Sequence, residues 1–320
     1  MSTVIEIENL TKDYEVGFLA KRKVRALDGL SLTVEAGEIF GFLGANGAGK
    51  STTMKLLMRL MYPTAGHARI LGRDISDISM HARIGYLPEH PYFYDYLTAR
   101  ELLVYCAELF GYARDECQRR AAEMLALVRL DEKSWDKGLR KFSKGMLQRV
   151  GLAQALVNDP EIVFLDEPMS GLDPIGRREV RDLIAGLRGK GTTVFFCSHI
   201  LSDIEVLCDR AAILQQGRLA HLGSLEDLRR HADAPRAIEI VVAHLGDIDG
   251  LIAALEQLPE ARLTPTPGGA RIEIPTEQDV DRALSSVRAC GARLVSVQAV
   301  GNALEELFLG ERSNEKSAER

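Results

Sequence analysis

Apolar and polar residues alternate over short segments near the start of the chain, a pattern typical of strands. Val4–Ile7 and Ala26–Val34 have this two-residue period and a charged loop separates them, so we expect antiparallel strands there. The continuous apolar run Ile39–Leu43 predicts a buried strand, and the spacing over Thr52–Met61 predicts a helix after it. The first part of the chain is therefore expected to be an antiparallel β subdomain that leads into a buried strand and a helix.

Helical spacing begins near Leu97 and continues to Phe142, which predicts a helical subdomain over about 97–142. Thr98 followed by Glu101 predicts a capping box at the start of its first helix. From Glu161 onwards, apolar strands alternate with helices, which predicts an α/β fold whose parallel sheet is covered on both faces. The predicted strands and helices are Ile162–Leu165, Arg177–Lys190, Thr192–Cys197 and Leu201–Leu207.

A second domain is predicted after a boundary near His231–Pro235, which leaves 1–230 for the first domain. Strand and helix patterns over 235–310 follow the order βαββαβ, with strands at 236–243, 261–265, 270–274 and 292–299. The helix patterns lie at 248–257, 277–289 and, after the last strand, 302–309. This order matches a small ferredoxin-like α+β domain. The charged tail, 311–320, is expected to be disordered.

Composition narrows the class of protein. Apolar residues make up 46% of the 320 residues and charged residues 27%, which is ordinary for a globular protein. The net charge of −6, without a sustained basic stripe, gives no reason to expect nucleic acid as a partner. The N-terminal residues do not predict a secretory signal, and without a run of 18 apolar residues we expect no membrane span. The five cysteines are scattered and suggest neither zinc nor disulfides, so we expect a cytoplasmic protein.

The most specific chemical signal is a phosphate-binding P-loop pattern, Gly-Ala-Asn-Gly-Ala-Gly-Lys-Ser-Thr at residues 44–52, between a predicted strand and a predicted helix. Glycines let backbone N–H groups approach an anion closely, and a helix start favours negative charge. Lys50 can reach the β- and γ-phosphates, and the Ser51 hydroxyl can hold Mg²⁺. A plain glycine-rich turn is the alternative, but the flanking strand and helix favour a nucleoside triphosphate site. The expected binding residues are Gly44, Asn46, Gly47, Gly49, Lys50, Ser51 and Thr52.

A second motif ends the strand Ile162–Leu165 with two acids, Asp166 and Glu167. Parallel strands bind ligands at their carboxyl ends, so both carboxylates are expected beside the P-loop. We expect Asp166 to anchor Mg²⁺ and Glu167 to polarise the attacking water. Two acids in a surface turn are the less specific interpretation.

With these motifs in place, the chain resembles the ATP-binding subunit of an ABC transporter over roughly residues 3–225. Further segments resemble family motifs in the expected order. They are Tyr14 for the adenine-stacking aromatic, Gly85–Glu89 for the Q-loop, Phe142–Arg149 for the signature loop, Ser170–Asp173 for the D-loop and Ser198–His199 for the switch histidine.

The resemblance implies a P-loop ATPase of the ABC type that uses ATP and Mg²⁺. It implies that Glu167, His199 and Lys50 are catalytic, and that Ser51, Asp166 and Glu89 face the metal. Tyr14 is expected to stack on adenine, although a tyrosine in an early strand can also simply be packed. Ser143 and Gly145 would bind the ATP of an opposite subunit, which implies a homodimer with ATP sandwiched between its copies.

Two positions depart from the family pattern. Glu89 stands where glutamine is usual, so it keeps an oxygen for Mg²⁺ or water but loses the amide donor. Lys144 stands in place of the first signature glycine, and it either points to solvent or adds positive charge near the phosphate of the opposite subunit. Neither change removes a group that hydrolysis needs.

The resemblance also implies a partner, because no membrane span is fused to the ATPase: a separate integral membrane permease would hold it at the cytoplasmic face of the membrane. Pro91–Thr98 and Asn302–Leu309 resemble segments of ABC-2-type exporters, which favours export of an unidentified substrate. The aromatic residues within Tyr92–Tyr96 suit a socket for a partner's helix, or they pack between subdomains. The alternative function is a soluble regulatory or assembly ATPase whose partner is not a transporter.

Overall fold

The computed structural model describes residues 2–17, 22–231, 237–243, 248–255, 258 and 261–299. The chain divides into two units, Met1–Leu225 and Glu226–Arg320, each with its own hydrophobic core. The predicted helix over 302–309 and the predicted disordered tail, 311–320, lie outside the described residues. In the part of the chain that is described, no helix has the length and apolar character needed to span a bilayer.

A six-stranded sheet in the order β10-β9-β3-β8-β7-β6 forms the centre of the first unit. All neighbouring strands are parallel except β10, which pairs antiparallel with β9. β3, β7 and β8 are buried along their whole length, because both faces of the sheet are covered. The strands are β3 (Ile39–Gly44), β6 (Ile84–Leu87), β7 (Ile162–Asp166), β8 (Thr193–Ser198), β9 (Arg210–Gln215) and β10 (Arg218–Ser224).

An antiparallel sheet in the order β2-β1-β4-β5 forms the other layer of strands in this unit. Its first two strands are longer than predicted, because charged cross-strand pairs continue the ladder beyond the apolar segments. Asp13 lies opposite Arg25, and the carboxylate is 2.8 Å from the guanidinium. The strands are β1 (Thr3–Val16), β2 (Arg22–Glu35), β4 (Ala65–Ile70) and β5 (Arg73–Asp74).

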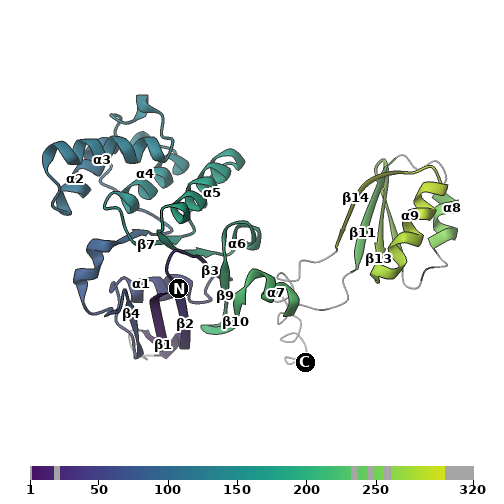
Figure 1. Cartoon of the computed structure of the whole chain (residues 1–320), viewed down its shortest axis with the longest axis horizontal. Coiled ribbons are helices and arrows are strands. Elements are labelled where there is room, and N and C mark those ends of the chain that lie inside the picture. Colours follow the sequence, from purple (N-terminus) through teal and green to yellow (C-terminus); the bar gives the residue numbers. More distant parts are fainter. Residues whose placement is uncertain are drawn as a thin grey trace. The chain divides into compact units, whose positions relative to one another are not determined.

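Three helices gather on one side of the first unit as the helical subdomain (Figure 1). The predicted capping box is present: Thr98 accepts from the Glu101 backbone, and the Glu101 side chain accepts from the Thr98 N–H at 2.8 Å. The helices of the subdomain are α2 (Ala99–Leu109), α3 (Arg114–Leu127) and α4 (Lys144–Leu156). Short 3₁₀ turns lie at Ile78–Arg83, Glu132–Ser134 and Leu139–Lys141.

Two helices that flank the central sheet differ from their predicted bounds. α1 (Lys50–Leu57) ends four residues earlier than expected, because Arg59 adopts a left-handed φ of 56° and the Leu60 N–H turns back to the Lys55 carbonyl. α5 (Pro174–Gly189) begins three residues earlier, because Asp173 caps it and proline is favourable in a first turn. Local capping chemistry, rather than apolar spacing, sets both ends. α6 (Leu201–Leu207) packs against β3 and β8, and α7 (Leu225–His231) begins at the last residue of the first unit.

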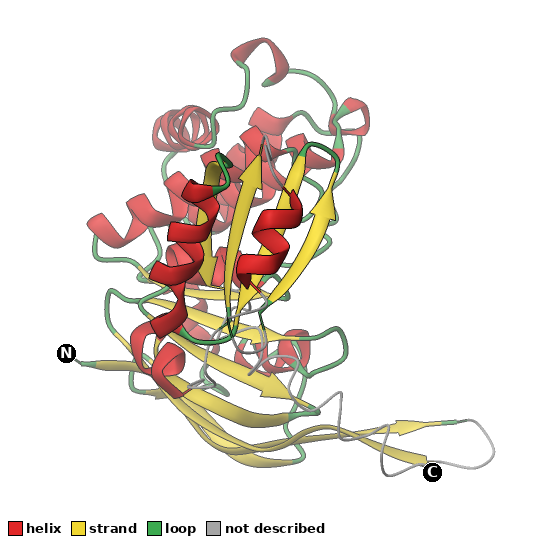
Figure 2. Ribbon diagram, turned by 90° about the vertical axis from the view of Figure 1, so that its right-hand side faces the viewer, coloured by secondary structure: helices red, strands yellow, loops and turns green. Residues whose placement is uncertain are grey.

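The second unit has the predicted βαββαβ order, and its sheet order β12-β13-β11-β14 is that of a ferredoxin-like fold. All of its strand pairs are antiparallel. Figure 2 shows its two helices lying across one face of the sheet, where apolar residues of both layers form the core. The elements are β11 (Ile238–Ala243), α8 (Ile248–Leu255), β12 (Arg262–Thr266), β13 (Gly269–Ile274), a 3₁₀ turn (Glu277–Asp279), α9 (Val280–Ala289) and β14 (Arg293–Ala299).

Candidate active site

The P-loop joins the end of β3 to the start of α1 and turns on glycines. Gly47 and Gly49 have φ of 83° and 110°, where residues with side chains are strained. A Cβ on Gly49 would also lie 2.7 Å from the Ala26 carbonyl oxygen. The Lys50 side chain is 6% exposed, and its ammonium donates to the Gly44 carbonyl oxygen at 2.6 Å. Since that oxygen is a neutral acceptor, a charged phosphate oxygen would bind the ammonium more strongly.

A cavity of about 270 Å³ is lined by P-loop residues, by Ala26 and by three acids. The lining residues are Ala26, Ala45, Asn46, Gly47, Gly49, Lys50, Ser51, Thr52, Glu89, Asp166 and Glu167. Asp166 is 2% exposed and its Oδ1 has no hydrogen-bond partner, whereas Ser51 does hydrogen-bond to this carboxyl group. Burial raises the pKa of Asp166 above its usual value, and the hydrogen bond with Ser51 opposes that rise. The cavity therefore contains a buried carboxylate oxygen with free lone pairs.

These oxygen donors fit Mg²⁺, which prefers hard ligands and usually combines one or two carboxylates with water and phosphate oxygens. No group of three or more His, Cys, Asp or Glu side chains able to hold a metal occurs among the described residues. Asp166, Ser51 and Glu89 are the oxygen donors at this cavity that could hold the ion.

Glu167 lies next to Asp166, at the point where the chain leaves β7. Its Oε1 is 2.8 Å from Nδ1 of His199 and 3.8 Å from Nζ of Lys50. Its backbone adopts a left-handed φ of 50°, a conformation that costs a non-glycine residue about 1–2 kcal/mol. The turn thus places a carboxylate between an ammonium and an imidazole at the edge of the cavity. Such a carboxylate can accept a proton from a water molecule.

Tyr14, far away in sequence on β1, is brought beside the P-loop. Its hydroxyl lies 3.3 Å from Oγ1 of Thr52 and 3.3 Å from Sδ of Met61. The Lys12 ammonium lies 5.4 Å from the ring centroid, within cation–π range. The ring is half-buried and is not among the residues that line the cavity, so its stacking on adenine stays a prediction.

Ser143 and Gly145 are not among the residues that line the cavity of their own chain. Ser143 caps α4 through a hydrogen bond from the Met146 N–H to its Oγ at 3.2 Å. Their predicted role toward the nucleotide of another copy is consistent with this separation and stays a prediction.

Sequence reasoning assigned no role to two side chains near the site. Gln148, 2% exposed, donates from Nε2 to the carbonyl oxygen of Glu167 at 3.4 Å. Tyr86 is close enough to Asp166 for that charge to add to burial in raising the pKa of its phenol to about 12. Gln148 lies within Phe142–Arg149 and Tyr86 within Gly85–Glu89, so the resemblance of these segments to the signature loop and the Q-loop was the available signal.

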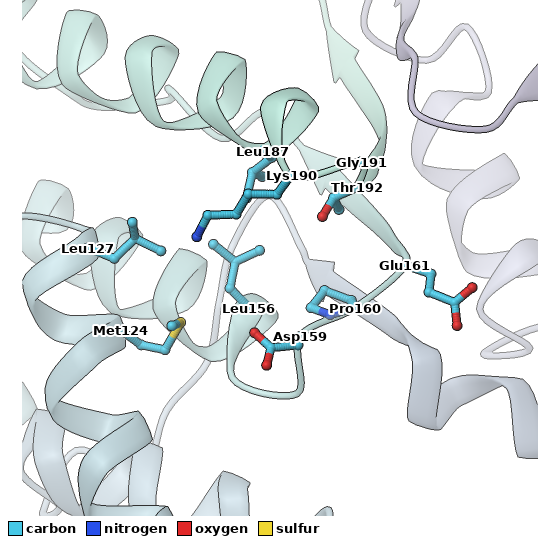
Figure 3. Close-up of a pocket in the computed structure, with 10 residues that line it drawn as sticks. All are labelled: Met124, Leu127, Leu156, Asp159, Pro160, Glu161, Leu187, Lys190, Gly191 and Thr192. Carbon is cyan, nitrogen blue, oxygen red and sulfur yellow. The ribbon is translucent and has the colours of Figure 1, made fainter.

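A second cavity, of about 330 Å³, lies in the first unit between α3, the end of α4 and the end of α5. Figure 3 shows Lys190, Leu127 and Leu156 around it. It adjoins Glu161 and Thr192, which immediately precede β7 and β8, so it lies at the opposite sheet edge from the P-loop. Ligands of open α/β sheets bind at the carboxyl edge, so the P-loop cavity is the candidate active site.

The family model and known proteins of similar sequence indicate the same family. Residues 27–170 match the family model described as ABC transporter. An uncharacterised ABC transporter ATP-binding protein of Synechocystis is 42% identical over 318 residues, covering 96% of this chain and 84% of that protein. The linearmycin resistance ATP-binding protein LnrL of Bacillus subtilis is 32% identical over 312 residues, covering 96% of this chain and 97% of that protein.

Among solved structures, the dimeric post-hydrolysis ATP-binding cassette MJ0796 bound to ADP and Pi matches with a TM-score of 0.64. It is 27% identical and covers 69% of this chain and 98% of that one. The structural likeness thus extends over about two thirds of the chain. The chain belongs to the family of ABC transporter ATP-binding proteins and is an ATPase.

Proposed function

We propose that this ATPase powers a separate membrane permease and that the pair exports a substrate. The permease would hold the chain at the cytoplasmic face of the membrane. The observation that carries the catalytic part of the proposal is the contact of Glu167 with both Lys50 and His199 at the P-loop cavity. Family membership supports the transport part, and the resistance named for LnrL favours export.

Each of these side chains has a task in hydrolysis. Lys50 binds phosphate oxygens and neutralises charge, a role for which its ammonium is already buried and directed into the P-loop. Glu167 orients the attacking water and accepts its proton, and His199 fixes the carboxylate through the 2.8 Å contact. Ser51, Asp166 and Glu89 would hold Mg²⁺, which would neutralise phosphate charge. Tyr14 stacks on adenine.

The active form is a homodimer with ATP between the copies. Supporting this, Ser143 lies at the start of α4, a 13-residue helix, and outside the cavity of its own chain. The positive end of a helix dipole favours an anion, so a phosphate bound by a second copy would fit there. The cassette that matches in structure is itself a dimer.

The aromatic stretch Tyr92–Tyr96 is the proposed permease socket. Tyr92 and Tyr96 are 94% and 72% exposed, and Tyr94 stacks near Tyr96 with ring centroids 5.8 Å apart. Large exposed aromatic side chains are typical of interface anchors. Packing between subdomains would have buried them, so their exposure favours the socket.

Reconstitution tests the transport role. The chain should be expressed together with a multi-span membrane protein encoded beside its gene, and the pair placed in vesicles. ATP turnover should then depend on the permease, and turnover and transport should be lost together when Lys50→Ala replaces the native chain. Turnover that no candidate permease alters, with the chain instead bound to a non-membrane partner, would favour the regulatory ATPase.

A further inference from the structure

Lys144, which replaces a glycine of the family pattern, lies across a loop of its own chain. Its Nζ donates to Oγ of Ser170 at 3.4 Å. A Cβ built on Gly171 would lie 2.6 Å from Cδ and 2.8 Å from Cε of Lys144. The alkyl chain therefore occupies the place where a side chain of residue 171 would lie. Lys144 is exposed, and its ammonium also bonds within its own chain, a contact that the sequence did not predict. The role of its charge toward the phosphate of a second copy stays a prediction.

A second contact lies nearby. A Cβ on Gly145 would be 3.1 Å from Cδ2 of Leu172, so the first turn of α4 and this loop are in close contact over several residues. The loop is thereby held between the start of α4 and the end of β7.

The loop begins with Glu167, whose left-handed φ of 50° has to be maintained by its surroundings. The Glu167 N–H donates to the Cys197 carbonyl at 3.1 Å. Its own carbonyl accepts from the Ser170 N–H at 3.0 Å and from the Gln148 side chain at 3.4 Å. Ser170 is thus joined both to Glu167, through the backbone, and to Lys144, through its hydroxyl.

We propose that Lys144 is a positioning residue for Glu167. By holding Ser170 and Gly171 against α4, it keeps the turn from Glu167 to Ser170 closed and so fixes the direction of the carboxylate. Gln148 supports the same turn from inside the protein. Glycine at position 144 would lack both the donor and the methylene groups that cover Gly171. The inference rests on the proposed role of Glu167 in orienting water.

The test measures kcat and KM for ATP in the full chain. Lys144→Met keeps an alkyl chain over Gly171 but removes the donor, and Ser170→Ala removes the acceptor. Each should lower kcat by ~3- to 10-fold with KM nearly unchanged, because coupled pairs in contact contribute about this much. The double variant should be no slower than the slower single variant, and Lys144→Arg should retain most of the native kcat.

Several results would overturn the proposal. If kcat is unchanged in Lys144→Met, Lys144 does not act on Glu167. If the fold-losses in kcat of the two single variants multiply in the double variant, Lys144 and Ser170 do not act as a unit. A raised KM with native kcat would show that Lys144 contacts the nucleotide instead. A fall in Tm that tracks the loss of kcat would show a merely structural contact.

Glu167→Gln separates this inference from the role on which it rests. Native turnover in that variant would refute the role of Glu167 itself. If Glu167→Gln is inactive but the losses of kcat in Lys144→Met and Ser170→Ala are independent of each other, only the positioning role of Lys144 is refuted.

Discussion

Asp166 and Glu167 are adjacent, yet their surroundings give them different chemistry. Asp166 is enclosed within the sheet edge, where burial raises its pKa and leaves one oxygen without a partner. Glu167 turns away through its left-handed backbone and meets His199 and Lys50. Adjacent carboxylates can thus serve a cation and a water molecule separately, because the turn sends them in different directions.

Replacing Glu167 with glutamine should lower turnover by about 100-fold or more, because an amide cannot accept the proton from water. ATP binding should persist, since the P-loop is unchanged, and loss of a negative charge near the phosphates should favour an ATP-bound dimer. Phosphate release and size-exclusion chromatography with and without ATP measure the two effects. Lys50→Ala is the matched contrast, in which ATP affinity itself should fall. Native turnover in Glu167→Gln would contradict the assignment.

Replacing Asp166 with asparagine should stabilise the nucleotide-free protein at neutral pH while abolishing Mg²⁺-dependent hydrolysis. A neutral amide costs less to bury than a carboxylate. A gain of ~1 kcal/mol would raise Tm by about 2–4 °C in a domain of this size. Thermal unfolding of both forms without nucleotide measures the gain.

The pH dependence gives a second check on Asp166. Because its pKa is raised in the folded state, the folded protein binds this proton more tightly than the unfolded chain. The associated stability is present below the unfolded pKa and is lost as pH rises through the folded pKa. The Tm advantage of Asp166→Asn should therefore shrink on acidification, and an advantage that grows would contradict the raised pKa.

At the scale of elements, the segment Tyr92–Tyr96 before α2 contains both exposed aromatic side chains, which are available for binding, and a half-buried one. Tyr92 and Tyr96 extend into solvent, whereas Phe93 is half-buried, with its Cζ 3.4 Å from the position of a Cβ on Gly151. The same short segment therefore has exposed aromatic residues that suit a socket and a half-buried one that packs.

Tyr92→Ala combined with Tyr96→Ala should weaken association with the permease without disabling the ATPase. Loss of a buried aromatic anchor costs ~2 kcal/mol or more, which is about a thirtyfold loss of association. Binding to permease-containing vesicles measures the association, and ATP turnover and Tm in solution measure whether the ATPase itself is intact. Phe93→Ala is the control and should mainly lower Tm. If the double variant binds these vesicles as well as the native chain does, the permease binds elsewhere on the surface.

At the scale of the whole molecule, the candidate active site lies entirely within the first unit. Every residue lining the P-loop cavity lies before Leu225, and the second unit has its own core. Independent folding of the two predicted domains, 1–230 and 235–310, stays a prediction.

A chain ending at His231, after α7, should therefore bind ATP with nearly native affinity. Fluorescence titration with a nucleotide analogue measures this, and circular dichroism reports whether the shortened chain is folded. Lost binding in a folded short chain would show that the second unit contributes to the site.

Sequence alone determined the features that depend on contiguous residues. The P-loop needs glycines, lysine and a hydroxyl within nine positions, and the buried strands β3 and β7 show as unbroken apolar runs. Because a parallel strand ends at the ligand edge, the order of strands and helices along the chain was enough to place Asp166 and Glu167 beside the P-loop. The βαββαβ order of the second unit followed from the same periodicity.

Tertiary structure decided the contacts between distant segments. Periodicity shows which face of an element is buried but not which side chain of another element it meets. For this reason the hydrogen bond from Gln148 to the Glu167 carbonyl and the contact of Lys144 with Ser170 could not be predicted. The left-handed turn at Glu167 is equally hidden, because nothing in the residue type favours it and hydrogen bonds with distant segments, from its N–H to Cys197 and from Gln148 to its carbonyl, hold it in place.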